Sequence, residues 1–178
     1  TGTGGLTKNS SGSLHLKGTG INTYSGTTIL NAGTLRLEKP SALGAATAGI
    51  DASAGTVLEL VGGITIAQEG LFFSGDTLPI RSREGLNTWG GMLTLPTTTK
   101  VIVDTDPLRL TGIIRTFAEA VLIKQGPVRL ELTANNTYPG DTTIQEGVLR
   151  ITGTQPSSRV VVLSNGTLEG TGVVGGFN

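Results

Sequence analysis

Asn22-Thr23-Tyr24-Ser25-Gly26 is the stretch from which the fold of this chain can be predicted, because the chain repeats it. Two further copies read Asn87-Thr88-Trp89-Gly90-Gly91 and Asn136-Thr137-Tyr138-Pro139-Gly140, so the shared pattern is Asn-Thr-aromatic-x-Gly. Recurring motifs of this kind indicate a repeat architecture, in which each copy packs on its neighbours. Such chains usually work as surfaces or spacers and not as a single chemical site.

The repetition extends well beyond these short motifs. Residues 8–37 align with residues 124–151, with Lys8 opposite Lys124 and Asn22 opposite Asn136. The first copy is slightly longer, and its extra residues fall within 17–21, which reads as a turn. Turns tolerate insertions while strands keep their register, so the alignment changes where a folded repeat allows it.

Aliphatic and polar residues alternate with a period of two along the whole chain. Each such triplet places two aliphatic side chains on one side of a strand and a polar side chain on the other. The clearest triplets are Leu14-His15-Leu16, Leu35-Arg36-Leu37, Leu58-Glu59-Leu60, Leu93-Thr94-Leu95, Leu108-Arg109-Leu110, Leu130-Glu131-Leu132 and Leu149-Arg150-Ile151. Many short strands among turn residues are typical of a sandwich, a barrel or a solenoid.

A shorter repeat of Gly-Thr-Leu type favours the solenoid among these three folds. Gly33 is followed by Gly55, and Gly147 by Gly166, so the unit is about 20 residues long, which suits one turn of a coil. The sequence therefore predicts an all-β protein, with residues 1–178 forming a single parallel β-helix of roughly eight turns and about 40 Å in length at ~4.8 Å per turn.

Composition excludes several classes of partner and cofactor. Thirteen basic and thirteen acidic residues give a formal net charge of zero, so we expect no nucleic-acid binding. The chain has no cysteine, which removes disulfides and thiolate metal sites, and we expect no cofactor. No apolar run approaches the ~18 residues of a transmembrane span, so this segment is not expected to insert into a membrane. Both ends lie in Gly/Thr-rich repeat sequence, which predicts a fragment of a longer repeat protein.

Candidate catalytic and metal-binding residues are few. Asp104-Thr105-Asp106 is the one local acidic pair, but Pro107 follows it directly, which favours a solvated turn over a cation site or a catalytic pair. His15, the single histidine, lies between two leucines and is expected to face solvent. One histidine without cysteine does not make a zinc site. We therefore predict no catalytic, metal-binding or cofactor-binding residue.

Two groups of residues are candidates for binding a partner. Tyr24, Trp89 and Tyr138 would form an aromatic strip suited to stacking on carbohydrate if their turns stacked in phase; the favoured alternative is that each ring caps a corner and packs on the next turn. Arg81-Ser82-Arg83-Glu84-Gly85 is the most charged stretch and is expected to protrude as a loop. Arg81 and Arg83 are then the candidate contacts, because loops commonly carry function.

The chain also resembles a known family. The series Leu6-Thr7-Lys8, Asn22-Thr23-Tyr24-Ser25-Gly26 and Gly33-Thr34-Leu35 resembles the passenger-associated transport repeat, also called the autotransporter-associated β-strand repeat. A second copy runs from Leu122-Ile123-Lys124 to Gly147-Val148-Leu149. The resemblance implies that the β-helix is right-handed and parallel. It also implies an exported, surface-exposed segment of a very large bacterial protein, in a family without a catalytic motif.

Three hypotheses of function follow. The leading one is a non-enzymatic stalk or fibre segment at the bacterial cell surface, which displays a distal functional region and aids vectorial folding during export. Its partners would be neighbouring repeats of the same protein or end-to-end copies of itself. The second is an adhesin that binds surface glycans. The third is a polysaccharide-active β-helix enzyme, which would require Asp51, Asp76, Asp104 and Asp141 to converge.

Overall fold

The computed structural model describes residues 2–45, 49–73, 77–116 and 119–177, and every regular element among them is a β-strand. The strands are β1 (Leu6–Lys8), β2 (Ser13–Leu16), β3 (Thr28–Leu30), β4 (Thr34–Leu37), β5 (Ile50–Ala52), β6 (Val57–Val61), β7 (Thr65–Ile66), β8 (Leu71–Phe73), β9 (Thr77–Arg83), β10 (Asn87–Trp89), β11 (Leu93–Leu95), β12 (Thr98–Val103), β13 (Leu108–Leu110), β14 (Ile114–Thr116), β15 (Val121–Gln125), β16 (Leu130–Leu132), β17 (Thr142–Ile151), β18 (Thr154–Gly170) and β19 (Val173–Phe177). The described residues contain no helix that is long and apolar enough to cross a membrane.

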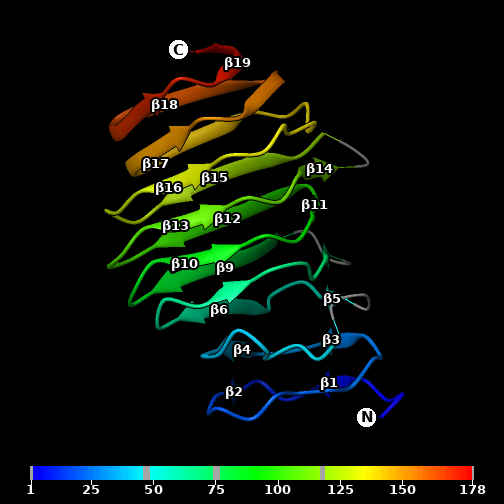
Figure 1. Ribbon diagram of the computed structural model, residues 1–178. Coiled ribbons are helices and arrows are strands. Elements are labelled where there is room, and N and C mark those ends of the chain that lie inside the picture. The colour runs from blue at the N-terminus through cyan, green and yellow to red at the C-terminus, as the bar shows by residue number, and fades with distance from the viewer. Residues whose placement is uncertain (1, 46–48, 74–76, 117–118, 178) are drawn as a thin grey trace.

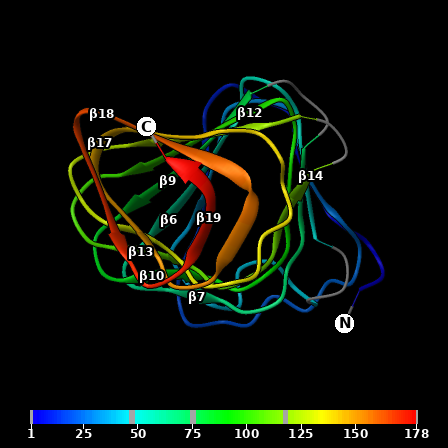
Figure 2. The same cartoon turned by 90° about the horizontal axis from the view of Figure 1, so that it is seen from above.

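The strands form three faces of a coil whose turns stack from the N-terminus to the C-terminus (Figure 1). Face A is the sheet β1-β3-β5-β8-β11-β14. Face B is the series β2-β4-β6-β9-β12-β15, and face C is the series β7-β10-β13-β16. β17 and β18 are long enough to continue from face B into face C, and the faces surround one central tube when seen along the axis (Figure 2).

All of these strand pairings are parallel, and each joins a residue to its counterpart one turn later. On face A, Leu6 lies opposite Thr28, and Thr28 lies opposite Ile50. On face B, Leu58 lies opposite Ile80. These separations match the repeat unit of about 20 residues that is typical of a solenoid turn. The structure confirms the predicted all-β solenoid of about eight turns.

Aliphatic side chains that point inward stack in columns and form the core. On face C, Leu108, Leu130 and Leu149 occupy one column in register, and each is fully buried. Burying a leucine contributes about 1.5–3 kcal/mol, so every added turn is stabilised by contact with the turn before it. The period-two alternation in the sequence therefore corresponds to side chains that point alternately into the core and out to solvent.

The two long repeats lie on different faces of the coil. Five turns along face A lead from Leu6 to Ile114, through partners at positions 28, 50, 71 and 93. The second repeat begins one strand later, in β15 on face B. The first copy thus supplies strands to faces A and B, while the second supplies faces B and C. This is possible because the inward and outward alternation is the same on every face.

Glycines allow close approach of the backbone at the corner between faces C and A. A Cβ on Gly91 would lie 1.8 Å from the carbonyl oxygen of Glu69, and one on Gly112 would lie 1.9 Å from that of Gly91. A Cβ on Gly153 would lie 2.0 Å from the carbonyl oxygen of Ala134. These contacts leave no room for a side chain, which explains the glycines at this corner.

Candidate functional site

The corner at which the chain leaves face B for face C carries most of the candidate chemistry. We call it the B–C corner. Its residues in successive turns are Glu84–Gly85, Asp104–Asp106, Gly126–Pro127, Glu146 and Asn165. The two charged stretches singled out from the sequence therefore lie in consecutive turns.

The prediction that Arg81–Gly85 protrudes as a loop is wrong. Arg81 and Arg83 belong to strand β9, and only Glu84 and Gly85 form the corner, both with positive φ angles of 52° and 80°. The corner is tied down by the next turn, since the Glu84 N–H donates to Thr105 Oγ1 at 2.8 Å and the Gly85 N–H donates to Asp106 Oδ2 at 2.9 Å. This stretch stays close to the coil because the acidic turn above it binds its backbone.

Asp104 of the acidic pair is bound by arginines of the preceding turn, while Asp106 accepts from the Gly85 N–H. Arg81 Nε lies 2.6 Å from Asp104 Oδ2, and Arg83 Nε lies 3.5 Å from the same oxygen. The hydrogen bond to Asp104 raises the pKa of Arg81 above its ordinary value. Arg83 also pairs with Glu59 at 3.4 Å, which extends the network along face B. No group of three or more His, Cys, Asp or Glu side chains within the described ranges is arranged to hold a metal ion.

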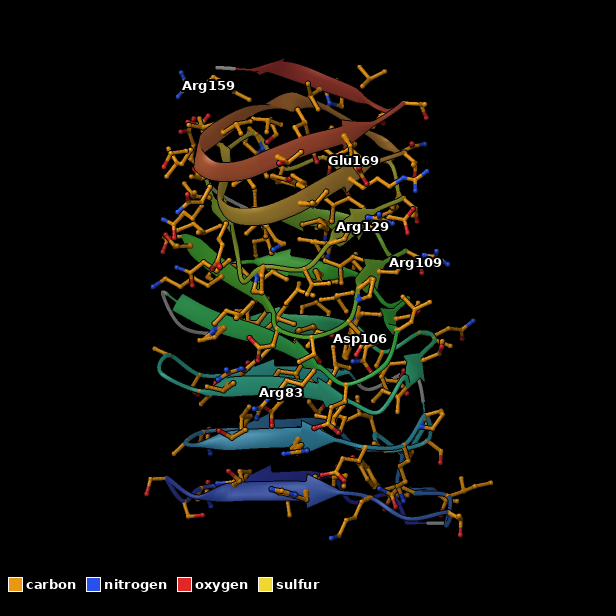
Figure 3. All side chains as sticks on the ribbon, turned by 90° about the vertical axis from the view of Figure 1, so that its left-hand side faces the viewer. Arg83, Asp106, Arg109, Arg129, Arg159 and Glu169 are labelled. Atoms are coloured by element: carbon orange, nitrogen blue, oxygen red, sulfur yellow. The ribbon has the colours of Figure 1, made fainter. Side chains whose placement is uncertain are left out.

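A second column of ion pairs runs along face C. Arg109, Glu131, Arg150 and Glu169 occupy one outward column in register. Arg109 Nε lies 2.9 Å from Glu131 Oε2, and Arg129 Nε lies 3.0 Å from Glu169 Oε1. Figure 3 shows Arg109, Arg129 and Glu169 one above another along this side of the coil. Exposed pairs of this kind contribute only about 0.2–1 kcal/mol each, so they order the surface more than they stabilise it.

Of the four acids that an enzyme would need, the three that the structure describes, Asp51, Asp104 and Asp141, do not converge. Asp51 faces outward on face A, between Ile29 and Phe72 in the neighbouring turns. Asp104 belongs to the B–C corner. Asp141 pairs with Arg159, whose hydrogen bond lowers the pKa of the Asp141 carboxyl. Asp76, the fourth acid considered from the sequence, lies outside the described residues.

The three aromatic residues do not form an exposed strip. Trp89 and Tyr138 are 1% and 0% exposed, so their rings are not available to a ligand, and Tyr24 is half-buried. The Tyr138 hydroxyl lies 2.6 Å from Thr142 Oγ1, and the Tyr24 hydroxyl lies 2.8 Å from Thr28 Oγ1, so both copies make the same bond. Burial raises the pKa of Tyr138 to about 12. Trp89 and Tyr138 lie inside the coil, and the Tyr138 hydroxyl is bonded to buried side chains, so both rings differ from the corner caps that the sequence favoured.

Sequence reasoning missed a buried lysine in each long repeat. Lys124 is fully buried at an inward position between Val101 and Ile144, and its Nζ donates to the carbonyl oxygens of Gln125, Gly126 and Glu146 at 2.9, 2.7 and 3.1 Å. Burial lowers the pKa of Lys124 to about 8. The available signal was its place in the period-two alternation that begins at Leu122.

Lys8 repeats this arrangement in the first copy. It is 6% exposed, and its Nζ donates to the carbonyl oxygens of Ser10 and, at 3.1 Å, Ala32. Ala32 is in the next turn, as Glu146 is in the turn after Lys124. We refer to Lys8 and Lys124 as the lysine clamps, because each ammonium group binds the backbone of two successive turns.

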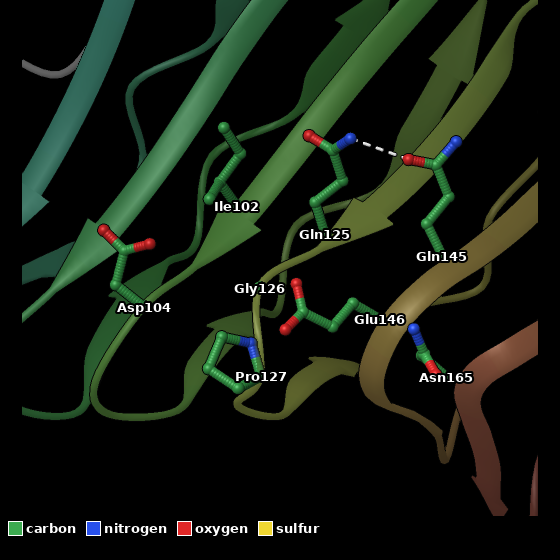
Figure 4. Close-up of a pocket in the computed structure, with 8 residues that line it drawn as sticks. All are labelled: Ile102, Asp104, Gln125, Gly126, Pro127, Gln145, Glu146 and Asn165. Carbon is green, nitrogen blue, oxygen red and sulfur yellow. Dashed lines mark hydrogen bonds between the residues drawn. The ribbon is translucent and has the colours of Figure 1, made fainter.

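An open pocket of about 410 Å³ lies at the B–C corner, and Figure 4 shows the residues that line it. It is lined by Ile102, Asp104, Gln125, Gly126, Pro127, Gln145, Glu146 and Asn165. Gln125 Nε2 donates to Gln145 Oε1 at 2.7 Å, so these two amides face each other. Two of the carbonyls bound by the clamp of Lys124, those of Gly126 and Glu146, belong to this lining.

Comparison with known proteins supports the family resemblance. An extracellular serine protease of Serratia marcescens is 48% identical to this chain over 56 residues, which are 32% of this chain and 5% of that protein. No solved structure matches the chain significantly. A family model described as the passenger-associated-transport-repeat matches residues 6–37 and residues 122–151, the two segments that carry the lysine clamps. The model thus matches the same two segments in which the sequence resembles the passenger-associated transport repeat, and it confirms that resemblance.

Proposed function

We propose that this chain is a structural segment of the passenger domain of an exported bacterial protein, and that it acts outside the cell as a stalk. The observation that carries the proposal is the continuous stack of parallel turns, in which inward columns join each turn to the next and a lysine clamp reinforces two of these junctions. A coil of this kind holds whatever is attached to its far end at a fixed distance. The similarity to an extracellular protein of Serratia marcescens supports an extracellular location.

We further propose that the segment has no catalytic role. Two of its acids are paired with arginines of adjacent turns, Asp104 with Arg81 and Asp141 with Arg159. Asp51, Asp104 and Asp141 belong to different turns, with Asp51 in strand β5, Asp104 at the B–C corner and Asp141 paired with Arg159. These ion pairs neutralise carboxylates that a catalytic site would use to polarise a substrate.

The same contacts suit a chain that folds as it emerges from a membrane. Each new turn can fold on the previous one, because its strands pair with the strands of that turn and its aliphatic side chains pack on those already in place. Turns that have folded outside the cell would oppose backward movement of the chain. Folding in this order aids export without an energy source at the surface.

Export of a reporter fusion tests this role. The segment would be placed between an epitope tag and an autotransporter translocation unit, and surface-exposed tag would be followed over time. We expect Gly140→Ala, which separates two turns, to lower the surface signal several-fold, and Gly12→Ala to leave it unchanged. Equal export of the two variants, with Gly140→Ala shown to be destabilised in vitro, would contradict a role of folding in export.

The partners we propose are neighbouring repeats of the same protein or end-to-end copies of this segment. β1 and β2 each pair with a strand on one side only, so their other edges can accept a strand. In the isolated segment, we expect association to rise with concentration in light-scattering measurements. A strictly monomeric segment at high concentration would contradict end-to-end pairing.

A further inference from the structure

We propose that the pocket at the B–C corner binds an uncharged oligosaccharide, laid along the axis of the coil. The proposal is independent of the structural role described above. Apart from Asp104, it concerns residues that sequence reasoning did not select, and it replaces the aromatic strip as the place where a glycan would bind.

The dimensions of the pocket fit a short chain of sugar rings. A volume of about 410 Å³ lies within the range of small-molecule sites. Its lining comes from four consecutive turns, from Ile102 at the end of β12 to Asn165 within β18. Three steps of ~4.8 Å make this lining roughly 14 Å long. The hollow therefore follows the axis, which suits an elongated ligand better than a compact one.

The hydrogen-bonding groups of the lining suit hydroxyl groups. The bond from Gln125 Nε2 to Gln145 Oε1 leaves the Gln125 carbonyl oxygen as an acceptor and the Gln145 amide as a donor. Asn165 adds one donor group and one acceptor, and the Glu146 carboxylate adds acceptors. A hydroxyl both donates and accepts, so a row of hydroxyls matches amides that offer both functions.

The charges of the lining disfavour an anionic ligand. The lining contains no lysine, arginine or histidine, and it contains the carboxylates of Asp104 and Glu146. Asp104 is neutralised by Arg81 and Arg83. The Glu146 carboxylate accepts no hydrogen bond and forms no ion pair among the described residues, although it interacts electrostatically with the Lys124 ammonium beneath it. One free carboxylate beside several amides favours a neutral polyhydroxylated ligand over a sulfated or carboxylated one.

The composition of the outward column of face B changes at this pocket. Along that column Arg36, Glu59 and Arg81 are charged and paired. The next positions are Ile102, Gln125 and Gln145, which are uncharged. Ile102 and Pro127 give the pocket apolar surface, on which the C–H faces of a sugar ring can pack.

The floor of the pocket is fixed before any ligand arrives. Lys124 Nζ holds the carbonyl oxygens of Gly126 and Glu146 at 2.7 and 3.1 Å. The backbone that carries Pro127 and the Glu146 side chain is therefore bound to the core. A site built on rigid strands loses little entropy when it binds, which favours recognition by a few hydrogen bonds.

A glycan array probed with the intact segment tests the proposal. The array would carry neutral, amino-sugar, sialylated and sulfated glycans, and the best neutral hit would be titrated by NMR. We expect neutral glycans to bind and Gln145→Ala to weaken the titrated interaction at least tenfold, because the variant removes the amide pair. Glu146→Gln should also weaken it. Gln68→Ala, an exposed glutamine elsewhere on the coil, should bind like the wild type.

Three results would overturn the proposal: no binding to any glycan, binding to acidic glycans only, or equal binding by Gln145→Ala and the wild type. Urea unfolding of each variant shows whether the coil is intact, so loss of binding can be assigned to the pocket. A negative array leaves the stalk role in place, because that role is tested by export of the reporter fusion.

Discussion

Lysine is an unusual residue inside a column of aliphatic side chains, and its position here has a clear physical reason. The stem of Lys124 continues the column between Val101 and Ile144, while its ammonium group reaches the corner where the backbone turns. The ammonium group bonds the carbonyl oxygens of Gln125, Gly126 and Glu146, and a buried carbonyl without a hydrogen bond is unfavourable by about 1–3 kcal/mol. Three donors on one nitrogen satisfy three such carbonyls.

Replacing the clamp is therefore expected to destabilise the coil. We expect Lys124→Met to lower the free energy of unfolding by about 3 kcal/mol, because methionine fills the volume of the stem but leaves three carbonyls unpaired. Urea unfolding followed by circular dichroism would measure this. Lys17→Met, at an exposed turn, should change stability by less than about 0.5 kcal/mol. A loss of the same size in both variants would refute the clamp.

Tyr138 gives the coil a sensitivity to alkaline pH. Its pKa is about 12 in the fold, above the ordinary value of 10, because burial disfavours the phenolate. The unfolded chain thus loses this proton first, and stability falls as the pH rises from 10 to 12. Two pKa units correspond to about 2.7 kcal/mol. We expect the stability advantage of wild type over Tyr138→Phe to disappear across this range, as measured by urea midpoints at each pH; an advantage that stays constant would argue against the buried phenol.

At the scale of single elements, the strands were predictable and their faces were not. Alternation in the sequence identifies the inward leucines of β4, β6, β13 and β16 correctly. It does not say which of three faces a strand joins, because all faces show the same alternation. The sequence of Arg81–Gly85 likewise does not show how this stretch contacts other turns, and its charges suggested a loop. Its place in a strand and a tied corner depends on Thr105 and Asp106 in the next turn.

The corners set a steric limit that one substitution can test. A Cβ on Gly140 would lie 1.9 Å from the carbonyl oxygen of Ala120 in the turn below. Gly140→Ala must push the two turns apart, and we expect a loss of about 3 kcal/mol in urea unfolding. Gly12→Ala is the matched control, since a Cβ there meets nothing within 4 Å. Similar stabilities for both variants would show that the corner yields without strain.

At the scale of the whole molecule, the sequence predicted the solenoid, the repeat family and the number of turns. It did not predict the pocket or the lysine clamps. Both depend on residues from different turns that meet only after those turns have stacked. The length of a turn also varies, since the turn from Val101 to its partner Lys124 is longer than the turn from Thr142 to its partner Val160. A fixed period therefore cannot bring those residues into register.

A coil of equivalent turns should tolerate the loss of one. Removing residues 93–113 deletes the turn from β11 to β13 and brings Ile114 to the place of Leu93 opposite Leu71. We expect this variant to remain folded and to unfold with a proportionally smaller dependence on urea concentration. Removing residues 93–103, about half a turn, shifts every later strand to the wrong face and should prevent folding. Circular dichroism and urea titration of both variants would decide.

The displacement of the second repeat by one face has a consequence for how such a rod meets its surroundings. The second copy begins one face further around the coil than the first, out of three faces. Successive copies of the motif would therefore follow a helical path around the axis. A further copy at the same spacing would begin on the remaining face. A rod built on this plan would present the outer surface of the motif on each of its three faces in turn.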